Sequence, residues 1–106
     1  MKILVVDGIE VLLDDWDWLR LCRYKWRVKT VSANGKRKYI VRDQRRHGKH
    51  ETIYMHRDVM NCPKGMEVHH IDSNFWDNRK EKLEIMESIG HIDIHKRIRE
   101  RIEAGN

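Results

Sequence analysis

Two adjacent histidines, His69 and His70, are the residues whose type and spacing most strongly suggest chemistry. They lie in the segment Val68-His-His-Ile-Asp-Ser-Asn74. Neighbouring side chains on a β-strand point to opposite faces of the sheet. If this segment is a strand, the two imidazoles face different surroundings. The doublet therefore predicts two separate tasks for the two rings.

A second pair, His91 and His95, is spaced i, i+4 in a segment with helical periodicity. On a helix these two residues lie about 40° apart, and Ile98 and Ile102 fall within the same arc. Both rings then point into the protein, where two histidines at this spacing can hold one metal ion. The alternative is that each is a core histidine bonded to a backbone carbonyl. With His69 and His70 earlier in the same short chain, the metal site is the favoured interpretation.

The segments around these residues must position them. Residues 65–70 are typical of a short strand, residues 71–76 of a polar loop, and residues 83–86 of a second strand. Residues 77–81 are predicted to open one helical turn, with Asp77 or Asn78 as its cap. A last helix is predicted from about residue 89 to residue 104, with Ser88 as its N-cap.

The positive charge of the chain comes from one window. Residues 25–50 hold ten Lys or Arg and one acid, a net charge of +9, whereas residues 1–24 and 51–106 each carry −2, giving the overall +5. Such a block attracts a polyanion, most simply the phosphates of nucleic acid. The alternative is a solvated basic face on an ordinary domain.

The basic window is predicted to form antiparallel strands. Residues 26–32 and 38–42 alternate apolar and basic side chains around the turn signal Asn34-Gly35, residues 44–50 are expected to be a loop, and residues 51–55 a third strand. A twisted sheet of this kind can lie in a DNA groove or along its backbone. The expected DNA-contacting residues of this window are Arg27, Lys29, Lys36, Arg37, Lys38, Arg42, Arg45 and Arg46.

A helix over residues 14–23 is predicted to pack on this sheet. Acids gather in its first turn and arginines near its end, as the helix dipole favours. Trp16, Leu19 and Arg23 fall on one face of this helix. We expect Trp16, Trp18 and Trp26 to be core or sheet-packing residues.

Length and composition restrict the class of protein. A chain of 106 residues with 40% hydrophobic and 37% charged residues is typical of one soluble domain. Its apolar runs are too short to span a bilayer, and an intracellular, cytoplasmic setting is the default expectation. Cys22 and Cys62 cannot form a four-thiolate zinc site; they could form one disulfide, but two small hydrophobic residues are the favoured interpretation.

Several of these motifs together resemble one known family, the HNH endonucleases. The matching segments are Val68-His-His-Ile-Asp-Ser-Asn74, Asp77-Asn-Arg79, Leu83, the pair His91 and His95, and the upstream stretch Tyr54-Met-His-Arg-Asp-Val-Met60. The chain looks like the small phage-borne and homing-type members, whose N-terminal sheet is similar to that of plant ethylene-response regulators. The resemblance implies an α+β fold in which an antiparallel three-stranded sheet with a helix precedes a ββα-metal finger. One domain over residues 1–106 would comprise a DNA-contacting part, 1–60, and a catalytic finger, 61–106.

The resemblance also implies roles. His70 would be the general base, whereas His69, His91 and His95 would hold a divalent ion such as Mg²⁺, Mn²⁺, Zn²⁺ or Ni²⁺. Arg79 would join the phosphate contacts, DNA would be the partner of a monomer or homodimer, and no membrane would be involved. A neutral imidazole is a suitable base near neutral pH.

Lys82 is a departure from the family pattern. The homing-type members usually have Asn at this position, where an amide and a carbonyl hold the loop that aims the base, and lysine offers only donors. Asn78 could take over the loop-holding role, or Lys82 could contact a phosphate. The alternative function is a DNA-binding module that keeps the metal finger only for structure. A colicin-type ribonuclease is a weaker third interpretation.

Overall fold

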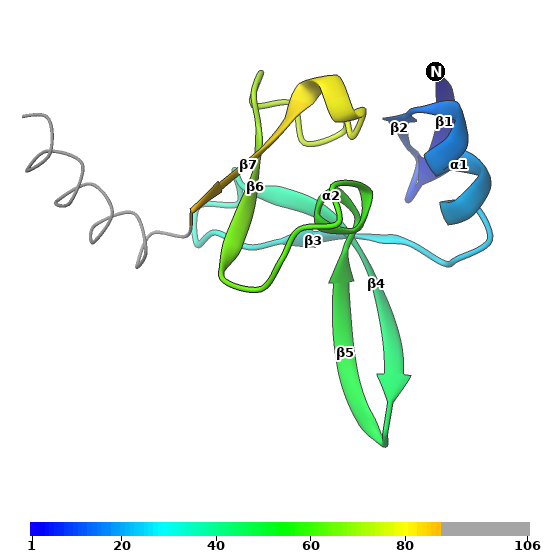
Figure 1. Cartoon of the computed structure of the whole chain (residues 1–106), viewed down its shortest axis with the longest axis vertical. Coiled ribbons are helices and arrows are strands. Elements are labelled where there is room, and N and C mark those ends of the chain that lie inside the picture. The colour runs from blue at the N-terminus through cyan, green and yellow to red at the C-terminus, as the bar shows by residue number, and fades with distance from the viewer. Residues whose placement is uncertain (88–106) are drawn as a thin grey trace, which may run out of the picture.

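The computed structural model describes residues 1–87, which form an α+β fold of antiparallel strands with two α-helices in this range (Figure 1). The elements in chain order are β1 (Lys2–Val6), β2 (Ile9–Leu13), α1 (Asp15–Leu21), β3 (Arg27–Thr30), β4 (Lys38–Arg46), β5 (Lys49–Tyr54), α2 (Met55–Val59), β6 (Met66–His70), a 3₁₀ turn η1 (Lys80–Lys82) and β7 (Leu83–Glu87). The predicted helix over residues 89–104, with His91 and His95, lies outside the described residues.

The first two strands form a hairpin that the sequence analysis did not predict. β1 and β2 pair antiparallel around Asp7 and Gly8, which both have positive φ angles, 49° and 79°. Asp-Gly is a strong signal for a two-residue hairpin turn because both positions need this left-handed backbone. A local signal for this hairpin is therefore present in the sequence.

The basic window forms the predicted three-stranded antiparallel sheet, in the order β3-β4-β5. The pairing of β3 with β4 around the Asn34-Gly35 segment is confirmed, with Arg27 opposite Val41. The predicted loop over residues 44–50 is wrong, because β4 continues to Arg46 and β5 begins at Lys49. Only His47 and Gly48 turn the chain, with φ angles of 53° and 75°, so a two-residue turn replaces the loop.

The second half of the described chain contains another hairpin. β6 and β7 pair antiparallel with Val68 opposite Ile85 and His70 opposite Leu83, which confirms the two predicted strands. The helical turn predicted at residues 77–81 is displaced to η1, whose N-cap is Arg79. Asp77 and Asn78 are buried before it and do not cap it, because their side chains bind Arg79 and His70 instead.

The core lies between the β1–β2 hairpin, α1, strand β4, α2 and the β6–β7 hairpin. Its buried hydrophobic residues are Val6, Val11, Leu13, Leu21, Trp26, Ile40, Met55, Val59, Val68 and Leu83. Burial of such side chains supplies the main favourable term in folding. Because residues from every described sheet contribute, the three small sheets share one core.

The predicted buried face of the first helix is wrong. The exposed fractions of Trp16 and Leu19 are 76% and 58%, whereas Asp17 and Leu21 are buried. Asp17 forms ion pairs with Lys80 and Arg20, and these partners offset the cost of burying its carboxylate. The other two tryptophans pack as expected, since Trp26 is buried and the half-buried Trp18 contacts the core.

The cysteines and the helices of residues 1–87 bear on the class of protein. Cys22 and Cys62 are both free and half-buried, which agrees with their interpretation as small hydrophobic residues. Among the described residues, no helix is long and apolar enough to cross a membrane.

Candidate functional site

His70 ends strand β6 with its ring inside the protein. Its Nε2 lies 2.8 Å from Oδ1 of Asn78, and both side chains are buried. The same amide donates from Nδ2 to the sulfur of Met55 at 3.5 Å, so its oxygen is directed at His70. Because an amide oxygen only accepts hydrogen bonds, Nε2 of His70 carries the proton. The basic nitrogen of His70 is therefore Nδ1.

The surroundings of His70 keep its ring neutral. Burial lowers the pKa of His70 below its ordinary value, and the hydrogen bond that its ring donates to Asn78 opposes this effect only in part. The nearby His69 lowers the pKa further, whereas Asp77 raises it. A neutral imidazole at neutral pH is the form that can accept a proton.

Three other rings surround the His70 imidazole, from sheet, helix and loop. The ring centroids of Tyr39, His56 and Phe75 lie 6.0, 5.2 and 5.6 Å from that of His70. His56 also stacks on Tyr39 at 4.7 Å with nearly parallel planes. Packed rings of this kind fix the position of a side chain. Neither Tyr39 nor Phe75 was predicted from the sequence to contribute to this site.

The surroundings of His56 give it a structural role. The ring is buried, and this burial together with His70 and Arg57 lowers its pKa to about 3. His56 is therefore neutral at neutral pH. His56 lies in the first turn of α2, directly after strand β5, and this position places its ring beside the sheet.

His69 faces the other side of strand β6. It is exposed, as are its neighbour Glu67 and its cross-strand partner Glu84, whereas Val68 and His70 are buried. The alternation predicted for the histidine doublet is therefore confirmed. His69 lines a cavity of about 490 Å³ together with Arg37, Tyr39, Thr52, Tyr54, His56, Arg57, Glu67, Val68 and Met86.

Of the three predicted metal ligands, the structure describes only His69. His91 and His95 lie outside the described residues, and within residues 1–87 no group of three His, Cys, Asp or Glu side chains could hold a metal ion. An exposed imidazole beside a cavity is a suitable ligand for Zn²⁺ or Ni²⁺ and a poorer one for Mg²⁺. Among residues 1–87, His69 is thus the one predicted ligand whose position can be described.

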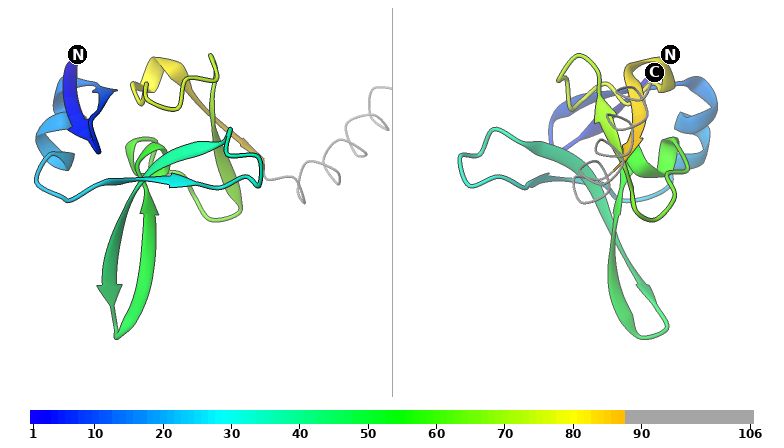
Figure 2. Two further views of the ribbon diagram at one scale, coloured as in Figure 1. Left: turned by 180° about the vertical axis from the view of Figure 1, so that it is seen from behind. Right: turned by 60° about the vertical axis from the view of Figure 1, so that its left-hand side comes forward.

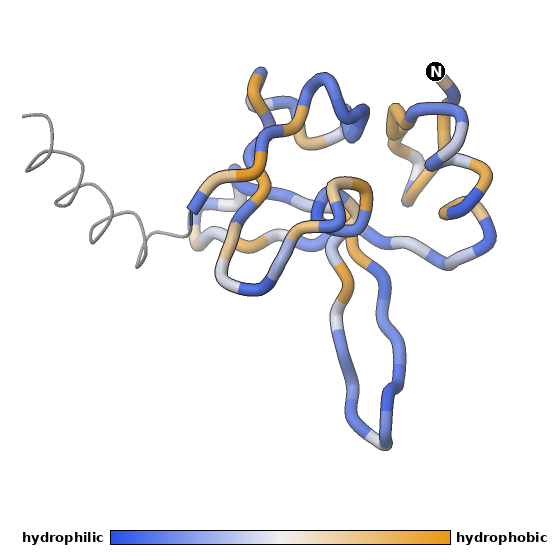
Figure 3. Tube along the Cα trace, viewed as in Figure 1, coloured by the Kyte–Doolittle hydropathy of each residue, from blue (hydrophilic) through white to orange (hydrophobic). Residues whose placement is uncertain are grey.

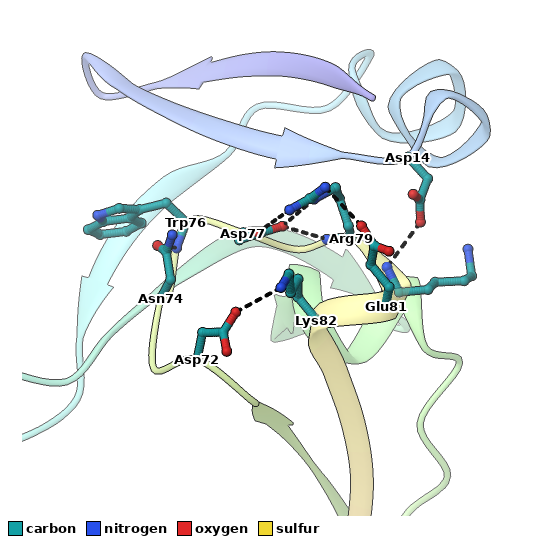
Figure 4. Close-up of polar contacts among 9 residues, drawn as sticks. Asp14, Asp72, Asn74, Trp76, Asp77, Arg79, Glu81 and Lys82 are labelled. Carbon is teal, nitrogen blue, oxygen red and sulfur yellow. Dashed lines mark hydrogen bonds and ion pairs between the residues drawn. The ribbon is translucent and has the colours of Figure 1, made fainter.

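The loop between β6 and β7 is held by a network of polar contacts (Figure 4). Asp77 accepts two hydrogen bonds from the guanidinium of Arg79, at 2.9 Å from Nε and 2.8 Å from Nη2, and a third from the backbone amide of Arg79 at 3.3 Å. This pairing lowers the pKa of Asp77 and raises that of Arg79, which also donates to Glu81. Arg79 was expected to contact DNA, but its guanidinium is engaged within the loop.

Lys82 also holds this loop. Its Nζ lies 3.0 Å from Oδ2 of Asp72, and its carbonyl accepts a hydrogen bond from the amide of Ile71 at 3.0 Å. The hydrogen bond to Asp72 raises the pKa of Lys82. Asn78 and Lys82 therefore have separate roles. Asn78 contacts the imidazole of His70, and Lys82 links the two ends of the loop.

The loop is also fastened to the first hairpin. The amide of Leu12 donates to the carbonyl of Trp76 at 2.8 Å, and the amide of Asn78 donates to the carbonyl of Leu12 at 2.9 Å. The side chain of Asp14 accepts from the amide of Lys80 at 3.0 Å. Strand β2 therefore sets the position of Asn78, and through it the position of His70.

The expected DNA-contacting residues of the sheet differ in their partners. Arg27 pairs with Asp43, Lys29 lies over the ring of Tyr54, and Arg42 lies over the ring of Tyr24 at 3.9 Å. The side chains of the other five form no ion pair or hydrogen bond with residues 1–87: Lys36, Arg37, Lys38, Arg45 and Arg46. The charge available to a partner is therefore concentrated near the two ends of β4.

Comparison with known proteins adds no assignment to this geometry. No protein-family model, curated protein or solved structure matches the chain. The candidate residues His69, His70 and Asn78 all lie in the segment from β6 to β7.

Proposed function

We propose that the protein is a metal-dependent DNA endonuclease of the HNH type. The observation that carries this proposal is the contact between Nε2 of His70 and Oδ1 of Asn78, next to an exposed His69 on the opposite face of β6. This arrangement separates a neutral base from a metal ligand by one peptide unit. Strands β6 and β7 pair antiparallel, and in this proposal they would be the two strands of a ββα-metal finger.

In this function His70 removes a proton from the water that attacks the phosphodiester. Asn78 fixes the tautomer, so Nδ1 of His70 accepts that proton. The rings of Tyr39, His56 and Phe75 hold the imidazole in one orientation. A divalent ion bound by His69 and the two later histidines would neutralise charge on the phosphate and on the leaving 3′ oxygen.

DNA is the proposed substrate because of the basic sheet. The window 25–50 carries +9, and cations near both ends of β4 lack acidic partners within residues 1–87. Neutralising DNA phosphates releases counterions, which makes such binding salt-sensitive. Tyr39 lies on β4 and contacts His70, so the basic sheet and the candidate base are adjacent.

The proposed function is tested by nicking of a supercoiled plasmid with chelator-treated protein and added Mg²⁺, Mn²⁺, Zn²⁺ or Ni²⁺. We expect H70A to lose nicking but retain bound metal, and H69A to lose both. Metal content therefore distinguishes the two roles: a variant of the base, H70A, retains the metal, and a variant of a ligand, H69A, loses it. Unchanged nicking by H70A would exclude His70 as the base.

A second function, a non-catalytic DNA-binding module with a structural metal finger, is favoured by one observation. The exposed fraction of His70 is only 4%, and its neighbourhood is filled by aromatic rings. A base needs access to water, whereas a buried histidine can serve packing alone. Absence of cleavage with every metal, together with salt-sensitive DNA binding, would establish this second function.

A further inference from the structure

The β3-β4-β5 sheet carries two groups of cationic side chains at opposite ends of strand β4. The proximal cluster is Lys36, Arg37 and Lys38, at the turn between β3 and β4. The distal cluster is Arg45, Arg46 and Lys49, around the turn between β4 and β5. Figure 2 shows that these two turns extend from the body of the molecule in different directions.

Between the two clusters the cations of the sheet are bound within the protein. Arg27 makes two hydrogen bonds to Asp43, at 2.7 and 3.1 Å, and His50 lies 2.9 Å from the same carboxylate. Arg42 stacks over Tyr24 and donates to Gln44. A polyanion would therefore meet its strongest attraction at the two ends of β4 and weaker attraction at the middle.

The proximal cluster lies beside the candidate site. Arg37 lines the same cavity as His69, and Tyr39, one residue after the cluster, has its ring 6.0 Å from that of His70. Phe75 contacts both Tyr39 and His70. A phosphate bound by this cluster would therefore be close to the proposed cleavage point.

The distal cluster lies on a two-stranded ribbon. β3 pairs with β4 only as far as Val41, and from Arg42 to Arg46 strand β4 pairs with β5 alone. All residues from Arg45 to Glu51 are exposed, and the ribbon extends away from the core as a hydrophilic arm (Figure 3). A two-stranded ribbon gains little stability by itself in water, but its width fits the major groove of DNA.

We propose that the distal cluster contacts duplex DNA about seven base pairs from the bond that is cleaved. From Tyr39, beside His70, to Arg46 there are seven residues of strand, or about 23 Å at about 3.3 Å per residue. B-DNA rises about 3.4 Å per base pair, so this length corresponds to about seven base pairs. The position relative to the cleaved bond rests on the proposed function, whereas the contact of the ribbon with DNA does not.

The register of the hairpin allows a matched shortening of the ribbon. Gln44 lies opposite Glu51, just as Arg46 lies opposite Lys49 beside the His47-Gly48 turn. Replacing residues 45–50 by Asn-Gly joins Gln44 to Glu51 through an equivalent two-residue turn and removes two residue pairs. A triple variant, R45Q/R46Q/K49Q, removes the charge but retains the length. K2Q/K25Q/K64Q removes three charges elsewhere and serves as its control.

The first experiment measures binding to a 30-base-pair duplex by fluorescence anisotropy, in chelator and over a range of salt concentrations. We expect the shortened ribbon and R45Q/R46Q/K49Q to bind on the order of tenfold more weakly, with a salt slope reduced by about two to three, whereas the control changes less. Equal affinity and equal slope for wild type and both ribbon variants would overturn the proposal. Equal binding of duplex RNA with the same dependence on the ribbon would overturn the choice of DNA.

The second experiment locates the contact. Duplexes are built around the bond that wild-type protein nicks most often, and each arm is trimmed one base pair at a time. We expect the wild-type affinity to fall when one arm drops below about seven base pairs, and both ribbon variants to lose this step. A step at the same arm length in the variants would overturn the distance. If no metal supports nicking but the first experiment shows the ribbon defect, the nuclease proposal fails and the ribbon contact stands.

Discussion

Nε2 of His70 lies 2.8 Å from Oδ1 of Asn78, and this contact joins the end of β6 to the loop that leads to β7. The amide of Asn78 in turn donates to the carbonyl of Leu12 in β2. The N-terminal hairpin therefore orients His70 through Asn78, although Leu12 lies almost sixty residues earlier in the sequence.

The first prediction changes Asn78. In N78D a carboxylate would face the imidazole and stabilise its protonated form, so the pKa of His70 would rise. A base must be neutral to accept a proton, so the acid limb of the pH–rate profile should move to higher pH and nicking near pH 7 should decrease. The measurement is the nicking rate from pH 5 to pH 9.

N78A is the companion variant, since it removes the contact without adding charge. It leaves a buried donor on His70 without its partner, and we expect it to lower the free energy of unfolding by about 1–3 kcal/mol. An unshifted pH–rate profile for N78D, in a variant that unfolds like wild type, would show that Asn78 does not act through His70.

The second prediction concerns Lys82. Lysine ties the loop through Asp72, whereas Asn would offer both an acceptor and a donor at this position. We therefore expect K82N to increase the nicking rate, with a change in stability below about 1 kcal/mol because the pair is largely exposed. D72N, which weakens the same pair without introducing Asn, is the control. A nicking rate in K82N no higher than that of D72N would show that Asn at position 82 does not improve the loop for catalysis.

The parts of the fold that local sequence rules describe were predicted well. Alternation along Val68-His69-His70 placed the two imidazoles on opposite faces, and the Asn34-Gly35 signal placed β3 against β4. Both follow from backbone geometry that neighbouring residues determine. The charge of the basic window was also visible, but not which arginines pair with Asp43 or stack on Tyr24.

The rest depended on contacts between distant segments. The burial of Asp17 on α1 requires Lys80, sixty-three residues away, and the place of Tyr39 beside His70 requires β4 to pack against β6. Periodicity alone cannot choose which face of a seven-residue helix is covered. This is why Trp16 and Leu19 were assigned to the core and are exposed.

The third prediction tests that correction by comparing two tryptophans. Trp26 is buried and donates from Nε1 to the carbonyl of Leu21 at 2.9 Å, whereas Trp16 is 76% exposed. We expect W26A to lower the free energy of unfolding by about 3–5 kcal/mol and W16A by less than about 0.5 kcal/mol. Urea unfolding followed by circular dichroism measures both. Comparable losses in the two variants would contradict the orientation of α1.

The last prediction concerns acid stability and His56. Burial lowers the pKa of this imidazole from 6.5 to about 3, so it stays neutral in the folded protein while the unfolded chain takes up a proton. A lowered pKa in the folded state means that the contribution is complete above about pH 6.5 and is lost as the pH falls toward about 3. Between pH 7 and pH 4 this one group should lower the free energy of unfolding by on the order of 3 kcal/mol. H56F retains a ring that can stack on Tyr39 but cannot titrate. Urea unfolding in chelator at both pH values should therefore give a smaller loss for H56F than for wild type, and equal losses would show that His56 is accessible to protons in the folded state.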